Sequence, residues 1–513
     1  MNKGAMRGAV AIAGLAVLTL AGCSGNRVAV GAPVATFTRY LDERLPRLMD
    51  RYGVPGAAVA VVREGELVWS GAYGYADLET DRPMTVDTVC RAESISKPVT
   101  AWGVMKLAEA GTLDLEEPVG SYVEELELRG SGFDERAVTV QHVLSNRSGL
   151  PLGTIGPPSE YAPGEPRPTA LEFVNEDAVI VREPGSGFLY SDVGFNTLEL
   201  VVETVTGEPF ADYMEREVLS PLGMVDSSYA WRDRYASDLA MGHEMDGTPV
   251  APYVYPARAS GGLFVDVEDV ARFVAAGAVG STGLRDGVLT GESLETIYRP
   301  RAEIPGLYGF VADSYGFGHF IETLPDGRRA VWHGGQGHGW MTHFHSVPES
   351  GDGIVILTNS QRAWPLIASV LPEWARWSGA GTVRFGVIVP ATRGFWALIG
   401  VVAAVALWRA FRVVAGLRAG TRRIAPLARS NRVARLIELL AGSGLVAFVV
   451  WRISLPYVDE ASVFPAAAPW AAVSFIALGV VLVVSSVAPA VGPRAASTDS
   501  APQPRGTPFR RAR

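Results

Sequence analysis

The chain has 513 residues, 48% of them hydrophobic, and a formal net charge of −9. This length allows one large domain or two ordinary ones with additional segments, and the acidic balance excludes nucleic acid as the main partner. Acidic residues crowd the first three quarters of the chain, and arginines crowd the last quarter. Lysine is nearly absent, occurring at Lys3, Lys97 and Lys106, so each lysine is informative wherever chemistry needs an amine.

The N-terminus has the pattern of a bacterial secretion signal. A basic start and a short apolar run precede Leu20-Ala21-Gly22-Cys23, which resembles the lipobox of lipoproteins. We therefore expect a signal peptide over residues 1–23, lipidation of Cys23, and a linker over residues 24–34, with an uncleaved signal anchor as the alternative. The remaining cysteine, Cys90, then has no disulfide partner and is expected to be a small core residue in a strand.

The next segment predicts a helix followed by a β-hairpin. Residues 35–52 place apolar side chains on one helical face. Two apolar runs, Ala57–Val62 and Leu67–Tyr73, flank the turn signal Arg63-Glu64-Gly65-Glu66 and are typical of a hairpin. Helical spacing resumes from Lys97 to Ala110. Together these elements indicate a layered domain of helices and strands.

The rest of this domain is first helical and then rich in strands. Scattered helices are expected in the Pro- and Gly-rich stretch 120–180, followed by helices over Asn196–Thr206, Pro209–Val218 and Val267–Ala275. The stretch Tyr308–Asn359 alternates apolar and polar residues between turns and predicts several antiparallel strands. The predicted class is therefore α+β, with layered α/β packing: an antiparallel sheet flanked by helices, with a helix-rich inserted subdomain.

Three apolar stretches near the C-terminus, 395–414, 436–454 and 468–490, each approach the roughly 20 residues needed to cross a bilayer. The loop between the first two is rich in arginine, the next loop is acidic, and the tail 491–513 is basic. The positive-inside rule then makes the first loop and the tail cytoplasmic and places residues 35–378 outside a bacterial cell membrane. The stretches carry few ionisable residues, which favours anchoring over transport.

A serine and a lysine at helical spacing are the first sign of chemistry. In Glu93-Ser94-Ile95-Ser96-Lys97, Ser94 precedes a helical run, and residues three apart on a helix share a face. A serine nucleophile needs a base, and a lysine can be deprotonated whereas an arginine cannot. Retention of Lys97 in a chain that uses arginine almost everywhere fits that need. The Ser-x-x-Lys pattern alone is nevertheless common in any sequence.

Two further motifs follow in order, Tyr190-Ser191-Asp192 and His333-Gly334-Gly335. With Ser-x-x-Lys they resemble the three motifs of serine β-lactamases and penicillin-binding proteins, whose class C branch carries Tyr-x-Asn and often His-x-Gly. The similarity extends from about residue 40 to residue 375 and includes 138–151 and Ser260-Gly261-Gly262-Leu263. The resemblance implies a serine hydrolase domain over residues 35–378.

The resemblance also implies catalytic roles. Ser94 would be the acylated nucleophile and Lys97 its base, and Tyr190 would help to move protons between the serine and the leaving group. No cofactor is implied.

Four further residues are implied to bind the substrate: Asp192, His333, Gly335 and Gln336. His333 and Gly335 would lie on an edge strand lining the site. The backbone N–H groups of Ser94 and Gln336 would form the oxyanion hole, which needs only donors near the developing negative charge.

The second motif departs from the family at Asp192, where relatives usually carry Asn. A carboxylate near Lys97 would stabilise the ammonium form and make Lys97 a weaker base. Tyr190 would then have to accept the Ser94 proton. Alternatively, Asp192 merely replaces the amide oxygen as a hydrogen-bond acceptor. We expect slower acylation or a changed substrate range.

Other chemistries are less well supported by the sequence. His333, His338, His343 and His345 are close along the chain, but no carboxylate or cysteine set with ligand spacing accompanies them, so we expect no metal. The glycines between 334 and 339 lack the strand–turn–helix context of a nucleotide loop.

Two functions follow from these observations. The first is a membrane-anchored hydrolase acting on a small molecule or peptide: a β-lactam, a D-amino-acid peptide of the cell wall, or an ester. The alternative is an acylatable or inactive sensor of such ligands, coupled to the membrane helices.

Overall fold

The computed structural model describes residues 27–130, 132–279, 288–306, 308–426, 431–455 and 463–490. The chain forms two compact units, residues 1–392 and 393–513. The predicted signal with Cys23 and the basic tail lie outside the described residues.

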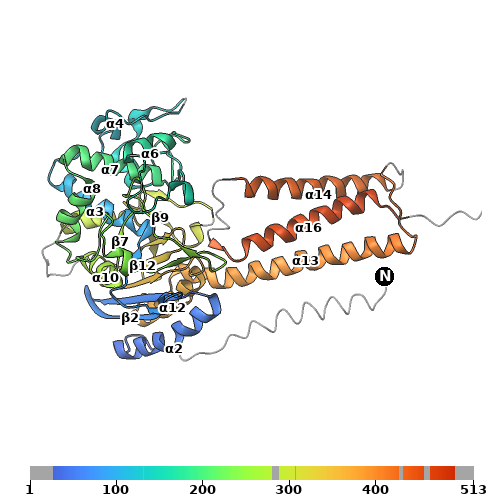
Figure 1. The fold of residues 1–513 in the computed structure, drawn as a ribbon, viewed down its shortest axis with the longest axis horizontal. Coiled ribbons are helices and arrows are strands. Elements are labelled where there is room, and N and C mark those ends of the chain that lie inside the picture. Colours follow the sequence, from blue (N-terminus) through green and yellow to red (C-terminus); the bar gives the residue numbers. More distant parts are fainter. Residues whose placement is uncertain are drawn as a thin grey trace, which may run out of the picture. The chain divides into compact units, whose positions relative to one another are not determined.

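The first unit is built on an antiparallel sheet (Figure 1). Among the described residues it has nine strands in the order β3-β2-β1-β13-β12-β11-β10-β9-β8. Their bounds are β1 Gly56–Arg63, β2 Glu66–Asp77, β3 Arg82–Pro83, β8 Ala302–Glu303, β9 Ser314–Tyr315, β10 Phe320–Thr323, β11 Arg329–Gln336, β12 Met341–Val347 and β13 Asp352–Thr358. Strands from the two ends of the domain pair directly, with Ala57 opposite Thr358.

The predicted hairpin is confirmed as β1 and β2. Its turn has positive φ angles at two consecutive residues, 52° at Glu64 and 76° at Gly65. Turns of this kind match the right-handed twist of the flanking strands, which explains why the short Glu-Gly sequence closes the hairpin.

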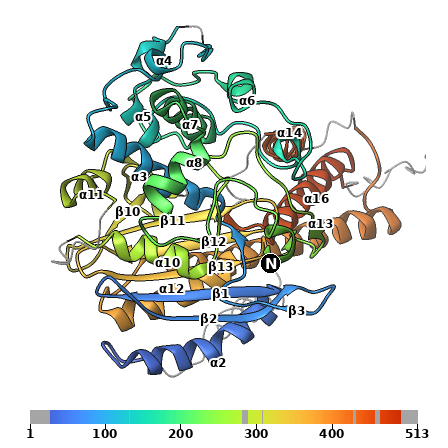
Figure 2. The same ribbon diagram turned by 60° about the vertical axis from the view of Figure 1, so that its left-hand side comes forward.

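Helices cover both faces of the sheet (Figure 2). On one face lie α2 (Val34–Tyr52) and α12 (Trp364–Ser378), where the ring of Phe37 stacks on Trp377 with 4.4 Å between centroids. The apolar face predicted for residues 35–52 is buried as expected. On the other face, α10 (Val267–Ala276) packs against the sheet.

The helix-rich insertion is also confirmed. It lies between two short paired strands, β4 (Cys90–Arg91) and β7 (Phe264–Val265), and Cys90 is fully buried as predicted. Its elements are α3 Ser96–Glu109, α4 Val119–Tyr122, α5 Val140–Leu144, α6 Ala170–Asp177, α7 Asp192–Thr206, α8 Phe210–Met214, α9 Tyr235–Asp238, β5 Gly242–His243 and β6 Pro249–Val250.

Helix α7 begins four residues earlier than the sequence predicted. The cause is the side chain of Ser191, whose Oγ accepts a hydrogen bond from the Gly194 N–H at 2.8 Å. Such a cap satisfies a backbone donor that would otherwise lack a partner. It places Asp192 in the first turn of α7, where the helix dipole favours a negative charge.

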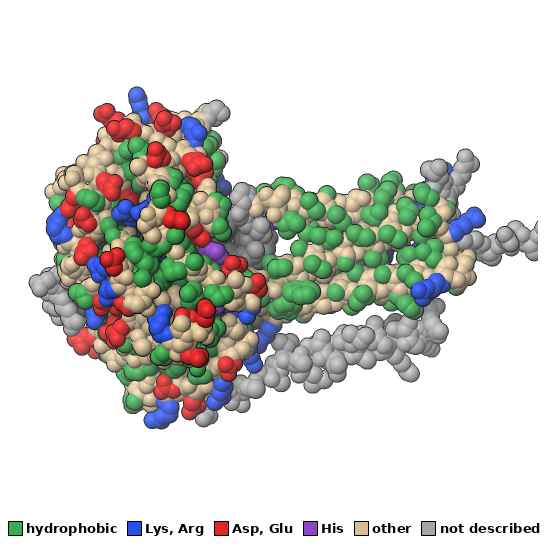
Figure 3. Space-filling model, in the orientation of Figure 1, with side chains coloured by type: hydrophobic (Ala, Val, Ile, Leu, Met, Phe, Trp, Pro, Cys, Tyr) green, Lys and Arg blue, Asp and Glu red, His purple; other side chains and the backbone are tan. Residues whose placement is uncertain are grey.

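The second unit holds the predicted apolar helices: α13 (Ile388–Arg418, which begins in the first unit), α14 (Arg432–Ile453) and α16 (Ala468–Val487). All three are long and apolar enough to cross a membrane, judged by length and composition. A Cβ at Gly442 would lie 2.6 Å from the Gly479 carbonyl oxygen, so glycine permits close packing of α14 on α16. Figure 3 shows apolar side chains along these helices and arginines at the end where α13 stops.

Candidate active site

Ser94 and Lys97 lie together, as their spacing predicted. Ser94 is half-buried in a short 3₁₀ turn, η2 (Glu93–Ile95), that leads directly into α3. Lys97 lies one turn further on and is fully buried, with its Nζ 3.0 Å from the Ser94 Oγ. The pair therefore has the geometry of a nucleophile and its base.

The Lys97 amine has two further polar neighbours. Its Nζ donates a 2.9 Å hydrogen bond to the Ser260 carbonyl oxygen and lies 2.5 Å from Asp192 Oδ1. Burial lowers the pKa of Lys97, and the carboxylates of Asp192 and Glu93 oppose that shift without cancelling it. A lowered pKa increases the fraction of neutral amine, the form that can accept a proton.

Tyr190 precedes α7 and faces the same pair. The Lys97 Nζ lies 4.7 Å from the centroid of its ring. Burial raises the pKa of Tyr190 well above its usual value, the Asp192 charge adds to this, and a hydrogen bond with the Ser94 hydroxyl partly offsets it. A neutral phenol donates a proton more readily than it accepts one. The pKa directions fit Lys97 as the base, and the expectation that Asp192 transfers this role to Tyr190 stays a prediction.

The third motif lies at the end of β11, where the expectation of an edge strand needs correction. β11 is internal to the sheet, between β10 and β12. Its pairing with β10 stops at Trp332 within the described residues, so the part from His333 to Gln336 forms only a local edge. At Gly335 a Cβ would lie 2.1 Å from the Ala92 carbonyl oxygen, and glycine thus allows this strand to approach the turn that carries Ser94.

His333 and Gln336 contribute in different ways. His333 is buried between Tyr315, whose hydroxyl lies 3.2 Å from Nε2, and the Gly334 carbonyl, 2.8 Å from Nδ1. Burial and the Lys97 charge lower the pKa of His333, so its ring is neutral. The Gln336 side chain accepts a 3.0 Å hydrogen bond from the indole of Trp364, a residue of α12 on the opposite face. The Gln336 side chain thus has a partner on α12, and the oxyanion-hole role predicted for Gln336 uses only its backbone N–H.

The other histidines do not join this site as a metal centre. His343 and His345 share a strand face, as predicted, with 3.3 Å between Nε2 and Nδ1. His338 lies between two carboxylates, Glu160 at 2.7 Å and Glu244 at 3.1 Å. Within the described ranges no group of three or more His, Cys, Asp and Glu side chains could hold a metal ion.

Three residues of the site carry no role in the sequence interpretation. Ser260 holds the Lys97 amine through its carbonyl, and Asn196 holds Ser260 by accepting a 3.0 Å hydrogen bond from its N–H. Glu93, next to the nucleophile, is buried. Ser260 lies in the Ser260-Gly261-Gly262-Leu263 stretch that contributes to the family resemblance, but no role was predicted for it from the sequence. Its contact with Lys97 is made by a backbone carbonyl oxygen, which every residue has.

Comparison with known proteins shows which family the chain resembles. The model of the family described as Beta-lactamase matches residues 41–405. Esterase EstB of Burkholderia gladioli is 28% identical over 374 residues, covering 64% of this chain and 91% of the esterase. A penicillin-binding protein of Bacillus subtilis is 23% identical over 347 residues, covering 63% of this chain and 72% of that protein.

Solved structures give the same picture. The octameric penicillin-binding protein homologue from Pyrococcus abyssi is 26% identical with a TM-score of 0.54, covering 65% of this chain and 77% of that one. A class C β-lactamase shares the fold, with 20% identity, a TM-score of 0.54, and coverage of 64% and 94%. The fold and the relatives are those of serine hydrolases. More particularly, the chain belongs to the β-lactamase family.

Proposed function

We propose that this protein is a membrane-anchored, extracytoplasmic serine hydrolase that forms an acyl-enzyme on Ser94. The observation that carries the proposal is the 3.0 Å contact between the Ser94 Oγ and the fully buried amine of Lys97, whose pKa is lowered. The lipobox-like sequence, the basic loop and tail, and three helices with the length and composition of membrane spans support the location.

The residues divide the acylation step among them. Neutral Lys97 takes the hydroxyl proton as the Ser94 Oγ bonds to the substrate carbonyl carbon. The backbone N–H groups of Ser94 and Gln336 stabilise the resulting oxyanion. When the bond to the leaving group breaks, the Tyr190 phenol gives that group a proton, and the Lys97 ammonium then reprotonates Tyr190. Water hydrolyses the ester and restores the Ser94 hydroxyl.

The substrate is a carbonyl compound with a nitrogen or oxygen leaving group. β-Lactams, D-amino-acid peptides of the cell wall and esters all meet this requirement. The names of the relatives, an esterase and a penicillin-binding protein, support this range without choosing within it.

A sensor is the second candidate, and one packing detail favours it. The turn η7 (Arg384–Val387) directly precedes α13, and its Phe385 ring packs 5.4 Å from the ring of Trp332, next to His333. The Arg384 N–H donates a 2.8 Å hydrogen bond to Glu322 of β10. A shift of β11 on ligand binding would therefore reach the start of the first apolar helix.

One experiment tests the proposal and separates the two candidates. Intact cells expressing the full chain are treated with a labelled, membrane-impermeant β-lactam and with an activated ester, and the adduct is mapped by mass spectrometry. We expect a covalent adduct on Ser94 that turns over, lost in Ser94→Ala and kept in Ser186→Ala, a control whose hydroxyl donates to the Glu183 carbonyl.

The outcomes are distinct. A Ser94 adduct that persists without turnover of either the β-lactam or the ester supports the sensor or a penicillin-binding role. Absence of any adduct from permeabilised and intact cells alike, with Ser94→Ala indistinguishable from the parent, overturns the hydrolase and the acylatable form of the sensor. Labelling only after permeabilisation overturns the extracytoplasmic location.

Replacement of Asp192 by Asn tests the departure in the second motif. Because the Asp192 carboxylate lies 2.5 Å from the Lys97 Nζ and raises the pKa of that amine, its removal should lower the Lys97 pKa further. We expect the rising, acidic limb of the pH–rate profile for Ser94 acylation to move to lower pH in Asp192→Asn. A profile that coincides with that of the parent protein, with no gain in rate, contradicts the role given to Asp192.

A further inference from the structure

The residue before the nucleophile has a backbone conformation that L-amino acids rarely adopt. Glu93 has a φ of 51°, in the left-handed region, where a Cβ crowds the carbonyl oxygen. A residue with a side chain stays there only when its surroundings hold it. The dihedral angles of Glu93 set the orientation of the peptide that joins it to Ser94, and the N–H of that peptide is one of the proposed oxyanion-hole donors.

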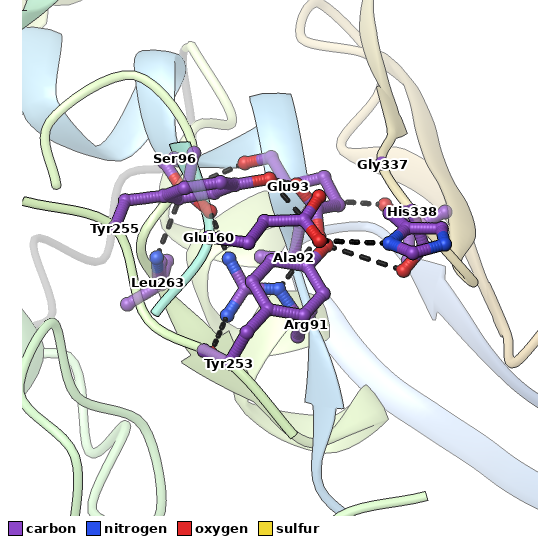
Figure 4. Close-up of polar contacts among 12 residues, drawn as sticks. Arg91, Ala92, Glu93, Ser96, Glu160, Tyr253, Tyr255, Leu263, Gly337 and His338 are labelled. Atoms are coloured by element: carbon purple, nitrogen blue, oxygen red, sulfur yellow. Dashed lines mark hydrogen bonds and ion pairs between the residues drawn. The ribbon is translucent and has the colours of Figure 1, made fainter. Parts of the chain in front are cut away.

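Three donors hold the Glu93 carboxylate (Figure 4). Arg91 Nε lies 2.7 Å from Oε1, the Tyr253 hydroxyl lies 3.0 Å from the same oxygen, and the Tyr255 hydroxyl lies 3.1 Å from Oε2. Glu93 is 2% exposed, so water does not compete for these bonds. Burial, with the Glu93 charge, raises the pKa of both phenols, which keeps them neutral donors.

The arginine is itself fixed. Arg91 is fully buried in β4, and its Nη1 donates a 2.7 Å hydrogen bond to the Tyr253 carbonyl oxygen. Its guanidinium carbon lies 4.0 Å and 4.6 Å from the ring centroids of Tyr253 and Tyr255. Separating such a buried charge pair is costly, because it leaves an uncompensated buried charge.

The same carboxylate also lies against the second oxyanion-hole segment. A Cβ at Gly337, the residue after Gln336, would lie 2.1 Å from Glu93 Cδ, so the carboxylate rests directly on that backbone. The Tyr253 hydroxyl lies 3.2 Å from the His338 carbonyl oxygen, in the same turn (Figure 4). Glu93 is thus joined by its peptide bond to Ser94, one proposed donor, and its carboxylate packs on Gly337, next to the other proposed donor, Gln336.

We infer that Glu93 is a positioning residue. Its carboxylate is held by Arg91, Tyr253 and Tyr255. Held in this way, it orients the backbone N–H groups of Ser94 and Gln336 toward the oxyanion. This inference rests on the proposed acyl-enzyme function. Glu93 contacts neither the Ser94 hydroxyl nor the Lys97 amine in the described hydrogen bonds, so it reaches the site through the backbone, and its charge raises the pKa of Lys97 only from a distance.

Two substitutions of Glu93 distinguish the effect of its positive φ from the effect of the hydrogen bonds that its carboxylate accepts. Glu93→Gly accepts the positive φ without strain but has no carboxylate, whereas Glu93→Gln keeps the shape and an oxygen acceptor for Arg91. The matched control is Asp269→Asn on α10, a buried carboxylate that is paired with Arg272 outside the site. Each full-length variant is assayed for kcat and KM on an activated ester and for the Ki of a boronic acid, which forms a tetrahedral adduct.

We expect Glu93→Gly to lower kcat and raise the boronic acid Ki by about 10²-fold, the size of losing one oxyanion-hole donor, with KM little changed. Glu93→Gln should retain most of the parent activity, and Asp269→Asn should leave both constants unchanged. A parent-like kcat and Ki in Glu93→Gly overturn the inference. If that variant does not fold, Tyr255→Phe, which removes one of the hydrogen bonds to the Glu93 carboxylate, overturns it by showing an unchanged Ki. A parent protein that is never acylated on Ser94 instead defeats the proposed function.

Discussion

Substitution of Lys97 by arginine should slow acylation of Ser94 by roughly 10⁴-fold at neutral pH, the upper end of what general acid–base catalysis contributes. The change places a permanent positive charge opposite Asp192 and removes the proton acceptor, since a guanidinium is not deprotonated in proteins. The structure gives the reason for expecting a large effect, because the amine is fully buried, lies 3.0 Å from the Ser94 Oγ and has a lowered pKa. The rate is measured by trapping the labelled adduct over time.

The chain provides its own control for this substitution. Lys106 lies on the same helix, α3, and its Nζ donates a 3.1 Å hydrogen bond to the Val288 carbonyl oxygen, away from Ser94. Lys106→Arg should acylate at the parent rate. If Lys97→Arg keeps more than a tenth of that rate while its thermal unfolding matches that of Lys106→Arg, a base other than Lys97 takes the Ser94 proton.

The local part of this site was predictable from the sequence. Ser94 and Lys97 are three residues apart next to a helical run, so helical geometry alone brings them together. Asp192 required more, because its 2.5 Å approach to Lys97 depends on the packing of α7 on α3. The resemblance to a known family supplied that contact, which spacing alone would not have given.

The supporting contacts were not predictable in the same way. Ser260 reaches Lys97 through a carbonyl oxygen that every residue possesses, and Arg91 meets Tyr253 across 162 positions of chain. The internal place of β11 depends on the strand order of the whole sheet, which alternation of apolar residues does not encode. The positive φ of Glu93 could not be predicted from the sequence either. Glutamate has no intrinsic preference for this conformation, which depends on the buried contacts of its carboxylate with distant residues.

The second large effect is expected at Tyr190, and it should depend on the substrate. Tyr190→Phe keeps the ring near the Lys97 amine and its stacking on Phe320, with 6.4 Å between centroids, but removes the phenol that gives a proton to the leaving group. We expect kcat/KM to fall by about 10³-fold for an amide or alkyl ester, within the usual range for general acid catalysis. For a nitrophenyl ester, whose leaving group departs without a proton, the loss should be much smaller.

This dependence on the leaving group distinguishes proton donation from a structural role of the tyrosine. Tyr213 is the appropriate control, since it is also buried and its hydroxyl donates a 2.9 Å hydrogen bond to the Gly103 carbonyl oxygen, outside the site. Tyr213→Phe should alter stability but treat both substrates alike. Equal losses on the two substrates in Tyr190→Phe would show that the phenol orients Ser94 or Lys97. The proton for the leaving group would then have to come from the Lys97 ammonium, the other proton donor beside the Ser94 Oγ in the described structure.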